Sequence, residues 1–489
     1  MNVVLFNLQQ PTNVFYRNFG CYKLASEIRR AGITCQVVEF LHYMSGPDFE
    51  TVLAKFITNN PELKIMGVST TFMASSYFYK SGNFIKSRLL RILQLCQEKG
   101  VKLVFGGANA LKIKSLDPAF DKAKCQYFIG YADTAFVNYC KSVVIDGKNP
   151  VILGGVNNFD TKASTYDFAN IQMEYGDNDL IFPNEALLLE ISRGCIFRCK
   201  FCAYPLNGKT KNDHIKCEDV LREELLDNYR RFGTTKYVIV DDTYNDSIDK
   251  MQMVANVVQS LPFKDEVEFA AFVRFDLIAS NFDIQLDLIK KINLKYMFFG
   301  IETLNDESGR LIGKGMPIKK TIDNLRRLRA EYDCYVSIGL IIGFPTDNLE
   351  VFRENYETII SERLADNITT LPLGIDHEMP FRSEFSLKAE EYGYQVDGFS
   401  WTNDRNDPRV ANSVLARELA TKFDDQAKAE FGLNRWSNSH IFYIKAMFNI
   451  LGRQVNKEAL EKTGSSPTVA DIDASYRVVY LKYMAKLLS

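Results

Sequence analysis

Short runs of apolar residues alternate with longer segments of helical spacing through the first part of the chain. The apolar runs cover 3–8, 34–40, 63–69, 101–107 and 126–130. The clearest helical pattern covers 84–100, where five apolar positions share one face (Ile85, Leu89, Ile92, Leu93 and Cys96) and Gly100 follows them. Strands that alternate with helices assemble into parallel sheets. Residues 1–150 are therefore predicted to form a doubly wound α/β domain with five strands.

Small and polar residues follow these predicted strands. They are Ser69, Thr70 and Thr71, then Gly106, Gly107, Ala108 and Asn109, then Gly130 and Tyr131. In parallel sheets a ligand lies beyond the carboxyl ends of the strands. Glycine and small residues let the backbone approach a flat or phosphorylated ligand closely. These positions are candidate ligand contacts, and ordinary tight turns are the alternative interpretation.

A second strand and helix pattern begins near residue 186. Residues 151–185 have no period and are rich in Asn, Asp and Gly, which predicts a linker. The next apolar runs are 186–192, 236–240, 267–273, 294–301, 335–342 and 368–375. Their spacing predicts a partial, six-unit TIM-like βα barrel over 186–378, with its chemistry on the loops that follow the strands.

The last part of the chain, 379–489, is predicted to be a mainly helical C-terminal domain. An apolar stripe at helical spacing near its end contains Tyr476, Val479, Tyr480, Tyr483 and Leu487. Such a stripe is more typical of a core than of a binding site. Segment 376–410 follows the last predicted strand, and its candidate substrate contacts are His377, Glu378, Arg382, Trp401 and Arg405.

Composition narrows the class of protein. A chain of 489 residues with 46% hydrophobic and 25% charged residues is globular, which excludes collagen-like, disordered and coiled-coil chains. A net charge of −2 gives no global attraction to nucleic acid or to an acidic membrane. The N-terminus has no signal-peptide pattern and no segment has a membrane-spanning length, so we expect a cytoplasmic protein. Disulfides are rare in that compartment, and most of the 10 cysteines are scattered among apolar stretches as small hydrophobic residues.

Three cysteines are bunched directly after the first strand of the predicted barrel. Cys195, Cys199 and Cys202 form a Cys-x3-Cys-x2-Cys array within ISRGCIFRCKFCAYP. A structural zinc site needs a fourth protein ligand, for which His214 and Cys217 are the nearby candidates. An iron–sulfur cluster held by only three cysteines keeps one iron open for a substrate or cofactor. The position on the catalytic face of a barrel favours the cluster.

This array, with Phe201 just before its last cysteine, resembles the radical S-adenosylmethionine (radical SAM) superfamily. The resemblance implies that the three cysteines hold a [4Fe–4S] cluster as metal ligands and catalytic residues. The open iron would bind S-adenosylmethionine, and one electron would cleave it to methionine and a 5′-deoxyadenosyl radical. It also implies an external one-electron donor such as a flavodoxin or a ferredoxin.

The ends of the other barrel strands match the family in order. By resemblance, Asp241, Asp242 and Thr243 would bind the methionine amino group, although helix capping is an alternative for the two carboxylates. Arg274 would pair with the methionine carboxylate. Glu302 would accept the ribose hydroxyls, Gly343 would contact the adenine through its backbone, and Phe201 would pack near that base.

The first 150 residues resemble the cobalamin-binding branch of the superfamily, whose first domain is Rossmann-like. The segments STTF, LVFGGAN and the glycine turn GYAD carry this resemblance. The chain departs from the branch because that turn lacks the usual acidic pattern and because the Asp-x-His-x-x-Gly motif is absent. His42 follows the second strand as a lone candidate ligand. The resemblance implies cobalamin as a cofactor on the strand ends.

The function that this resemblance implies is cobalamin-dependent methylation of an unactivated carbon. A radical SAM oxidoreductase, cyclase or isomerase without methyl transfer is the alternative within enzymes. A zinc-stabilised, non-catalytic binding protein is the alternative from another class. The substrate is a small molecule or a peptide of unknown identity, and neither a membrane nor a nucleic acid is an expected partner.

Overall fold

The computed structural model describes residues 1–8, 15–71, 82–150, 156–157, 166–204, 206–375, 382–398, 400–431, 438–452 and 469–489. The chain divides into two compact units. The first unit contains Met1–Asp167, Ile171–Phe182 and Ala470–Ser489, and the second contains Phe168–Asn170 and Pro183–Val469.

The first unit is built on a parallel sheet of 6 strands in the order β2-β1-β3-β4-β5-β6. Its strands are β1 (Val3–Asn7), β2 (Cys35–Val38), β3 (Ile65–Ser69), β4 (Lys102–Gly106), β5 (Gln126–Ile129) and β6 (Val156–Asn157). The first five strands lie where the apolar runs predicted them. The short β6 was not predicted because no apolar run marks it. The doubly wound α/β class of this part of the chain is confirmed.

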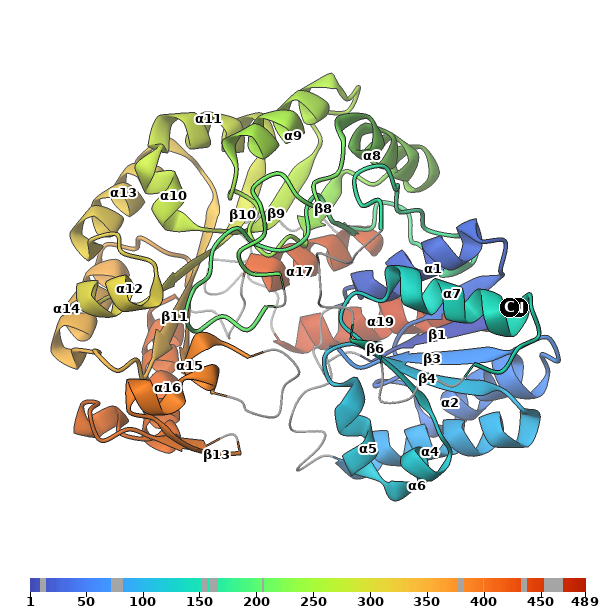
Figure 1. Ribbon diagram of the computed structural model, residues 1–489. Helices are drawn as coiled ribbons and strands as arrows, with labels where there is room; N and C mark the ends of the chain where they lie inside the picture. The colour runs from blue at the N-terminus through green and yellow to red at the C-terminus, as the bar shows by residue number, and fades with distance from the viewer. Residues whose placement is uncertain are drawn as a thin grey trace. The chain divides into compact units, whose positions relative to one another are not determined.

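Helices cover both faces of this sheet, with α1 and α7 on one side and α2 and α4 on the other (Figure 1). The helices are α1 (Phe19–Arg30), α2 (Gly46–Leu53), α4 (Gly82–Lys99), α5 (Ile113–Leu116), α6 (Pro118–Lys122), α7 (Asp133–Val144) and α19 (Val469–Leu488), with a π-helical turn at Ala54–Thr58. The predicted apolar face of α4 is buried, from Ile85 to Cys96. Gly100 follows the helix with a φ of +70°, a conformation that suits glycine.

The C-terminal helix α19 belongs to the first unit, which corrects the predicted domain boundaries. Its tyrosines pack on the segment after β2, where the rings of Phe40 and Tyr483 lie 5.2 Å apart. The backbone N–H of Glu39 donates to the Tyr483 hydroxyl over 2.9 Å. The aromatic stripe is therefore a core, as predicted, but its partner is the N-terminal sheet. Residues 379–489 do not form a compact domain of their own.

Part of the predicted linker also belongs to the first unit. Segment Ile171–Phe182 is anchored by Asp179, whose fully buried carboxylate accepts from the Arg29 guanidinium at 2.6 Å. The same carboxylate accepts from the backbone N–H of Gly176 at 2.7 Å. A polar composition predicted a connection here, but these contacts fix the segment against α1.

The second unit contains a parallel sheet of 6 strands in sequential order from β12 to β7. Its strands are β7 (Leu187–Leu189), β8 (Lys236–Ile239), β9 (Glu268–Val273), β10 (Leu294–Glu302), β11 (Tyr335–Ile342) and β12 (Asn367–Pro372). All six lie where they were predicted. The two end strands are not paired with each other, so the sheet is a partial barrel.

Helices line the outer face of this sheet, while α17 lies on its inner side (Figure 1). The outer helices are α8 (Glu218–Phe232), α9 (Ile248–Ser260), α10 (Phe275–Ser280), α11 (Phe282–Lys291), α12 (Asp306–Ile312), α13 (Ile318–Glu331) and α14 (Leu349–Ser361). The remaining elements are α15 (Glu384–Leu387), the hairpin β13 (Gln395–Asp397) and β14 (Ser400–Thr402), α16 (Ser413–Phe431) and α17 (Asn438–Ile450). Among the described helices, none is long and apolar enough to cross a membrane.

Candidate cofactor site

The three clustered cysteines lie on the loop that leaves β7, and backbone hydrogen bonds close this loop on itself. The N–H of Cys195 donates to the carbonyl of Leu206 at 3.1 Å, and the Cys195 carbonyl accepts from Gly208 at 2.7 Å. Gly194 has a φ of +79°, and a Cβ there would come within 2.4 Å of the Leu206 side chain. Glycine is therefore required where the loop turns back on itself.

The cysteine side chains have polar neighbours from the next strands of the sheet. The Cys195 sulfur lies 3.3 Å from the hydroxyl of Thr243, and the Arg274 guanidinium donates to the Cys199 sulfur over 3.2 Å. Burial raises the pKa of the Cys195 and Cys202 thiols. Bound iron would reverse this effect, because a coordinating thiol is deprotonated.

The two candidate fourth ligands of a zinc site, Cys217 and His214, have structural neighbours of their own. Among the described residues, no three His, Cys, Asp or Glu side chains are grouped as the ligands of one metal ion would be. Sulfurs that share one zinc lie about 4 Å apart, whereas each cysteine of a four-iron cluster binds a different iron. Cys217 precedes α8, and its backbone N–H donates to the carbonyl of Ala169 at 3.0 Å. His214 packs edge-on against Phe168.

The two aspartates after β8 have different environments. The carboxylate of Asp241 accepts from the backbone N–H groups of Ile191 and Ser192 at 2.8 and 2.9 Å. It also pairs with the fully buried Lys250 ammonium at 3.4 Å. Asp241 therefore ties β7 to β8, and its oxygens are already in use. Burial, with the nearby charges of Asp241 and Glu190, raises the pKa of the half-buried Asp242 to about 6.

Arg274 follows β9, where its guanidinium is held by Asp276. Its Nε and Nη2 donate to that carboxylate at 2.9 and 2.7 Å. Burial opposes the charge, but the hydrogen bonds and the charge of Asp276 outweigh it, and the pKa of Arg274 is raised. The two N–H groups of Arg274 that were predicted to bind the methionine carboxylate already donate to the Asp276 carboxylate.

Glu302 ends β10 in a strained conformation, with a φ of +71°. The register between β10 and β11 shifts between Gly300 and Glu302. The Lys314 ammonium pairs with the Glu302 carboxylate at 2.9 Å and also donates to the Gly300 carbonyl. A Cβ at Gly300 would come within 2.4 Å of that carboxylate, so glycine leaves the space that Glu302 occupies. Strain of this kind is concentrated at functional sites.

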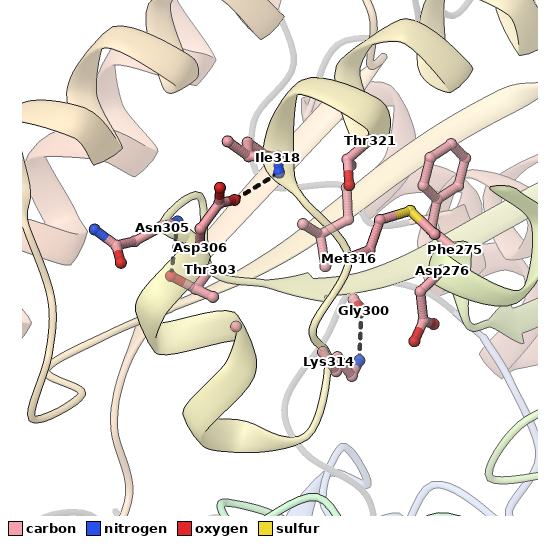
Figure 2. Close-up of a pocket in the computed structure, with 12 residues that line it drawn as sticks. Phe275, Asp276, Gly300, Thr303, Asn305, Asp306, Lys314, Met316, Ile318 and Thr321 are labelled. Carbon is pink, nitrogen blue, oxygen red and sulfur yellow. Dashed lines mark hydrogen bonds between the residues drawn. The ribbon is translucent and has the colours of Figure 1, made fainter. Parts of the chain in front are cut away.

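A small pocket opens beside the end of β10, between α10, α12 and the start of α13. Figure 2 shows Lys314 reaching back to Gly300, and the Asp306 carboxylate bonded to the backbone N–H of Ile318. Asp276 also lines this pocket. Asp276 was noted in the sequence beside Arg274 but given no role, and Lys314 was missed. The local signal for this lysine is its place between two glycines, Gly313 and Gly315, shortly after β10.

Gly343 is enclosed by its own chain. Its carbonyl accepts from the hydroxyl of Tyr394 at 2.6 Å, and its N–H donates to Asp347 at 2.8 Å. Its φ is +109°, and a Cβ would lie 2.9 Å from the Trp401 ring. The backbone contact to adenine that was predicted for Gly343 therefore competes with existing hydrogen bonds. Phe201 is half-buried, and its ring lies 6.1 Å from that of Phe344.

Trp401 also differs from its prediction as a substrate contact. It is 2% exposed, and its indole N–H donates to the carbonyl of Leu373 at 2.9 Å. This side chain supports the turn after β11. Arg382 and Arg405 are exposed, whereas His377 and Glu378 lie outside the described residues.

In the first unit, the predicted ligand contacts gather along the carboxyl ends of β3 and β4. The Thr70 hydroxyl donates to the Gly106 carbonyl at 2.9 Å, and the Asn109 amide donates to the Thr70 carbonyl at 3.2 Å. Gly107 has a φ of +104°, and a Cβ there would lie 2.3 Å from the Thr71 hydroxyl. Along this edge and after β5, the partly open positions are Ser69, Gly106, Gly107, Ala108, Asn109, Gly130 and Tyr131.

His42 has a structural partner. Its Nε2 lies 3.2 Å from the hydroxyl of Tyr476 in α19. Burial and the nearby Arg88 lower the pKa of this histidine to about 4. A neutral core histidine is therefore the better description of His42 than a metal ligand.

Comparison with known proteins finds a family match within the second unit. The model of the radical SAM superfamily matches residues 189–359. The ribosomal protein uS12 methylthiotransferase RimO of Caldicellulosiruptor saccharolyticus is 25% identical over 189 residues, 36% of this chain and 41% of that protein. A putative methylthiotransferase of Methanocaldococcus jannaschii is 26% identical over 230 residues, 43% of this chain and 49% of that protein. The chain thus spans less than half the length of these curated relatives.

Solved structures share the fold over nearly the whole chain. The radical S-adenosylmethionine methyltransferase TsrM of Kitasatospora setae, with cobalamin and a [4Fe–4S] cluster bound, has a TM-score of 0.60 at 12% identity and covers 99% of this chain and 98% of its own. The cobalamin-dependent enzyme OxsB, with aqua-cobalamin and S-adenosylmethionine bound, has a TM-score of 0.56 at 13% identity and covers 99% and 80%. With three cysteines on the first loop of a partial barrel, residues 189–359 form a domain of the radical SAM superfamily.

Proposed function

We propose that this chain is a cobalamin-dependent radical SAM enzyme that methylates an unactivated carbon of a small molecule or peptide. The observation that carries the proposal is the Cys195, Cys199 and Cys202 array on the β7 loop of a radical SAM domain. The doubly wound sheet that precedes this domain, with small residues along its carboxyl edge, supports the cobalamin part.

The residues present fit a [4Fe–4S] cluster with S-adenosylmethionine. Three thiols on one closed loop supply three iron ligands and leave one iron open. When bound, this pair of cofactors supplies a carbon-centred radical that abstracts a substrate hydrogen. The chain holds the cofactors, orients them and excludes water.

Residues after different strands of the second sheet would bind different parts of S-adenosylmethionine. Asp242 is the half-buried carboxylate after β8; it accepts from the backbone of Gly194 and suits the methionine ammonium, whereas Asp241 keeps the strand ends in register. Thr243 lies against the Cys195 sulfur and positions that ligand. Glu302, steadied by Lys314, suits the ribose hydroxyls, and Phe201 suits the adenine face.

The carboxyl edge of the first sheet fits a flat macrocycle such as a corrin. The Thr71 hydroxyl allows no side chain at Gly107, and Thr70 holds the end of β4 in place. The carboxyl edge of this sheet therefore carries mainly small residues that are partly exposed. When bound, cobalamin supplies the methyl-transfer chemistry. The Nε2 of His42 lies against the Tyr476 hydroxyl, and the sequence has no Asp-x-His-x-x-Gly motif to supply a histidine to cobalt.

The proposed reaction has a characteristic set of products. Each turnover consumes one substrate C–H bond, two molecules of S-adenosylmethionine and two electrons, which an external one-electron donor supplies one at a time. The products are the methylated carbon, S-adenosylhomocysteine, methionine and 5′-deoxyadenosine, which carries the substrate hydrogen.

The curated relatives favour a second candidate, because several are methylthiotransferases at 23–26% identity. A methylthiotransferase would deliver sulfur as well as a methyl group. A radical SAM oxidoreductase, cyclase or isomerase would form 5′-deoxyadenosine without S-adenosylhomocysteine. A zinc-stabilised binding protein would form neither product.

The experiment is anaerobic reconstitution with iron, sulfide, cobalamin and methyl-deuterated S-adenosylmethionine, followed by mass spectrometry. We expect one cluster and one corrin per chain, and both S-adenosylhomocysteine and 5′-deoxyadenosine as products. 5′-Deoxyadenosine alone would favour the non-methylating alternative, and one zinc without iron or sulfide would overturn the radical assignment.

A further inference from the structure

Arg274 is fixed in place at both its backbone and its side chain. Its N–H donates to the amide oxygen of Asn245 at 2.8 Å, and its carbonyl accepts from the amide nitrogen of the same residue at 2.9 Å. The residue is 6% exposed, at the start of α10. Its guanidinium stacks on the ring of Phe197, with the two groups 3.7 Å apart. Phe197 belongs to the cysteine loop, so Arg274 links that loop to the end of β9.

The hydrogen-bond donors of Arg274 are distributed among three partners. Nε and Nη2 are taken by Asp276, and Nη2 also donates to the Gly313 carbonyl at 2.9 Å. A guanidinium has five N–H donors in a fixed plane. With Nε and Nη2 engaged, Nη1 is the donor that points to the Cys199 sulfur, over 3.2 Å.

This arrangement differs from a site for the methionine carboxylate. Arginine binds a carboxylate most strongly with two parallel N–H groups. In this chain Asp276 accepts that pair, with both of its oxygens within 3.1 Å of the guanidinium. A second carboxylate would have to displace a buried ion pair, whereas the sulfur contact uses the donor that remains.

We propose that Arg274, held by Asp276, is a positioning residue that raises the reduction potential of the cluster on Cys195, Cys199 and Cys202. The inference rests on the proposed function, because it requires the cluster. Hydrogen bonds to the sulfurs and net charge set the potential of iron–sulfur clusters. The reduced cluster carries more negative charge, so a buried N–H aimed at a ligand sulfur stabilises it more than the oxidised form.

The test is a reductive titration of the anaerobically reconstituted full chain without S-adenosylmethionine, followed by electron paramagnetic resonance. Arg274→Gln should shift the midpoint potential to a more negative value. Arg274→Lys keeps the charge but lacks the planar fork, and should give an intermediate value. The matched control is Arg329→Gln, because Arg329 in α13 forms a similar two-pronged pair with Asp366, the residue before β12, at 2.9 and 2.7 Å. The control should keep the wild-type potential.

Equal midpoint potentials in Arg274→Gln, Arg329→Gln and the wild type would overturn the inference and leave the proposed function intact. If Arg274→Gln holds no cluster, Arg274→Lys decides: a potential below the wild-type value supports the inference, and the wild-type value overturns it. A wild-type chain that holds no iron–sulfur cluster would overturn both the inference and the proposed function.

Discussion

At the residue scale, the cysteine array and the two aspartates after β8 carry the proposed chemistry. The three cysteines stand out because their spacing brings three sulfurs onto one loop. Asp241 and Asp242 look equivalent in the sequence, and only their partners distinguish them. Asp241 is buried and accepts from two backbone N–H groups, whereas Asp242 is half-buried and accepts from the backbone of Gly194. The structural role of Asp241 depends on partners from other segments of the chain, such as Lys250, which the sequence does not reveal.

Removing Lys250 tests the structural role of Asp241. Lys250→Met should lower the free energy of unfolding by about 3 kcal/mol, because it leaves buried carboxylates without their cation. Lys291→Met is the matched control, because its pair with Asp287 is exposed and should contribute little. Urea unfolding followed by circular dichroism measures both. Equal unfolding midpoints would contradict the structural role.

The raised pKa of Asp242, about 6, predicts a pH dependence of cofactor binding. The carboxylate is charged above that pH and suits the methionine ammonium, so the affinity for S-adenosylmethionine should fall as the pH drops through it. The sign for stability is opposite: ionisation is disfavoured in the fold, so this group destabilises the chain as the pH rises from about 4 to 6. Calorimetric titration with S-adenosylmethionine should show a pH dependence that Asp242→Asn removes. An unchanged profile in that variant would exclude Asp242 as its source.

At the element scale, the strands and the residues that follow them could be predicted, because apolar runs and glycine turns are local signals. The contacts that lock those turns could not, because they join segments far apart in the chain. Thr71 and Gly107 illustrate the difference: both were selected as ligand contacts, and the structure adds that one leaves no room for a side chain on the other. Gly343 and Trp401 are a second such pair: both were predicted as contacts, and the Trp401 ring leaves no room for a side chain at Gly343.

Alanine variants of two glycines distinguish the cost of a positive φ from the cost of a side chain that overlaps its neighbours. Gly107→Ala and Gly147→Ala both place a side chain at positive φ, but a Cβ would overlap Thr71 only at Gly107, and Gly147 has open space. Gly147→Ala should lower the free energy of unfolding by about 1 kcal/mol. Gly107→Ala should lower it further and should also weaken cobalamin binding. Thermal unfolding and corrin absorbance measure the two effects, and equal behaviour of the variants would contradict the crowded edge.

At the scale of the whole molecule, the unexpected feature is that the last helix completes the first unit. The apolar stripe of α19 was visible in the sequence, but the surface that it covers was not. The helix follows the second unit in the chain, and no local pattern shows that it packs on the N-terminal sheet. Its tyrosines surround Phe40, which follows β2.

Changes on opposite faces of α19 should therefore have different effects. Tyr476→Ala with Tyr483→Ala removes buried rings, and should destabilise the first unit and reduce the cobalamin bound per chain. Val478→Ala with Leu481→Ala alters the exposed face of the same helix and should change neither. Iron content should stay constant in both variants, because the cysteines lie in the second unit. Parallel loss of iron and cobalamin would contradict this assignment of α19.

The central claim is that Cys195, Cys199 and Cys202 support radical cleavage of S-adenosylmethionine. Mass spectrometry of 5′-deoxyadenosine, formed by anaerobically reconstituted protein with a chemical reductant, tests it most directly. We predict that the wild type and Cys217→Ala form this product, because Cys217 lies outside the array, and that Cys199→Ala does not. Absence of the product from the wild type, or undiminished formation by Cys199→Ala, would contradict the claim.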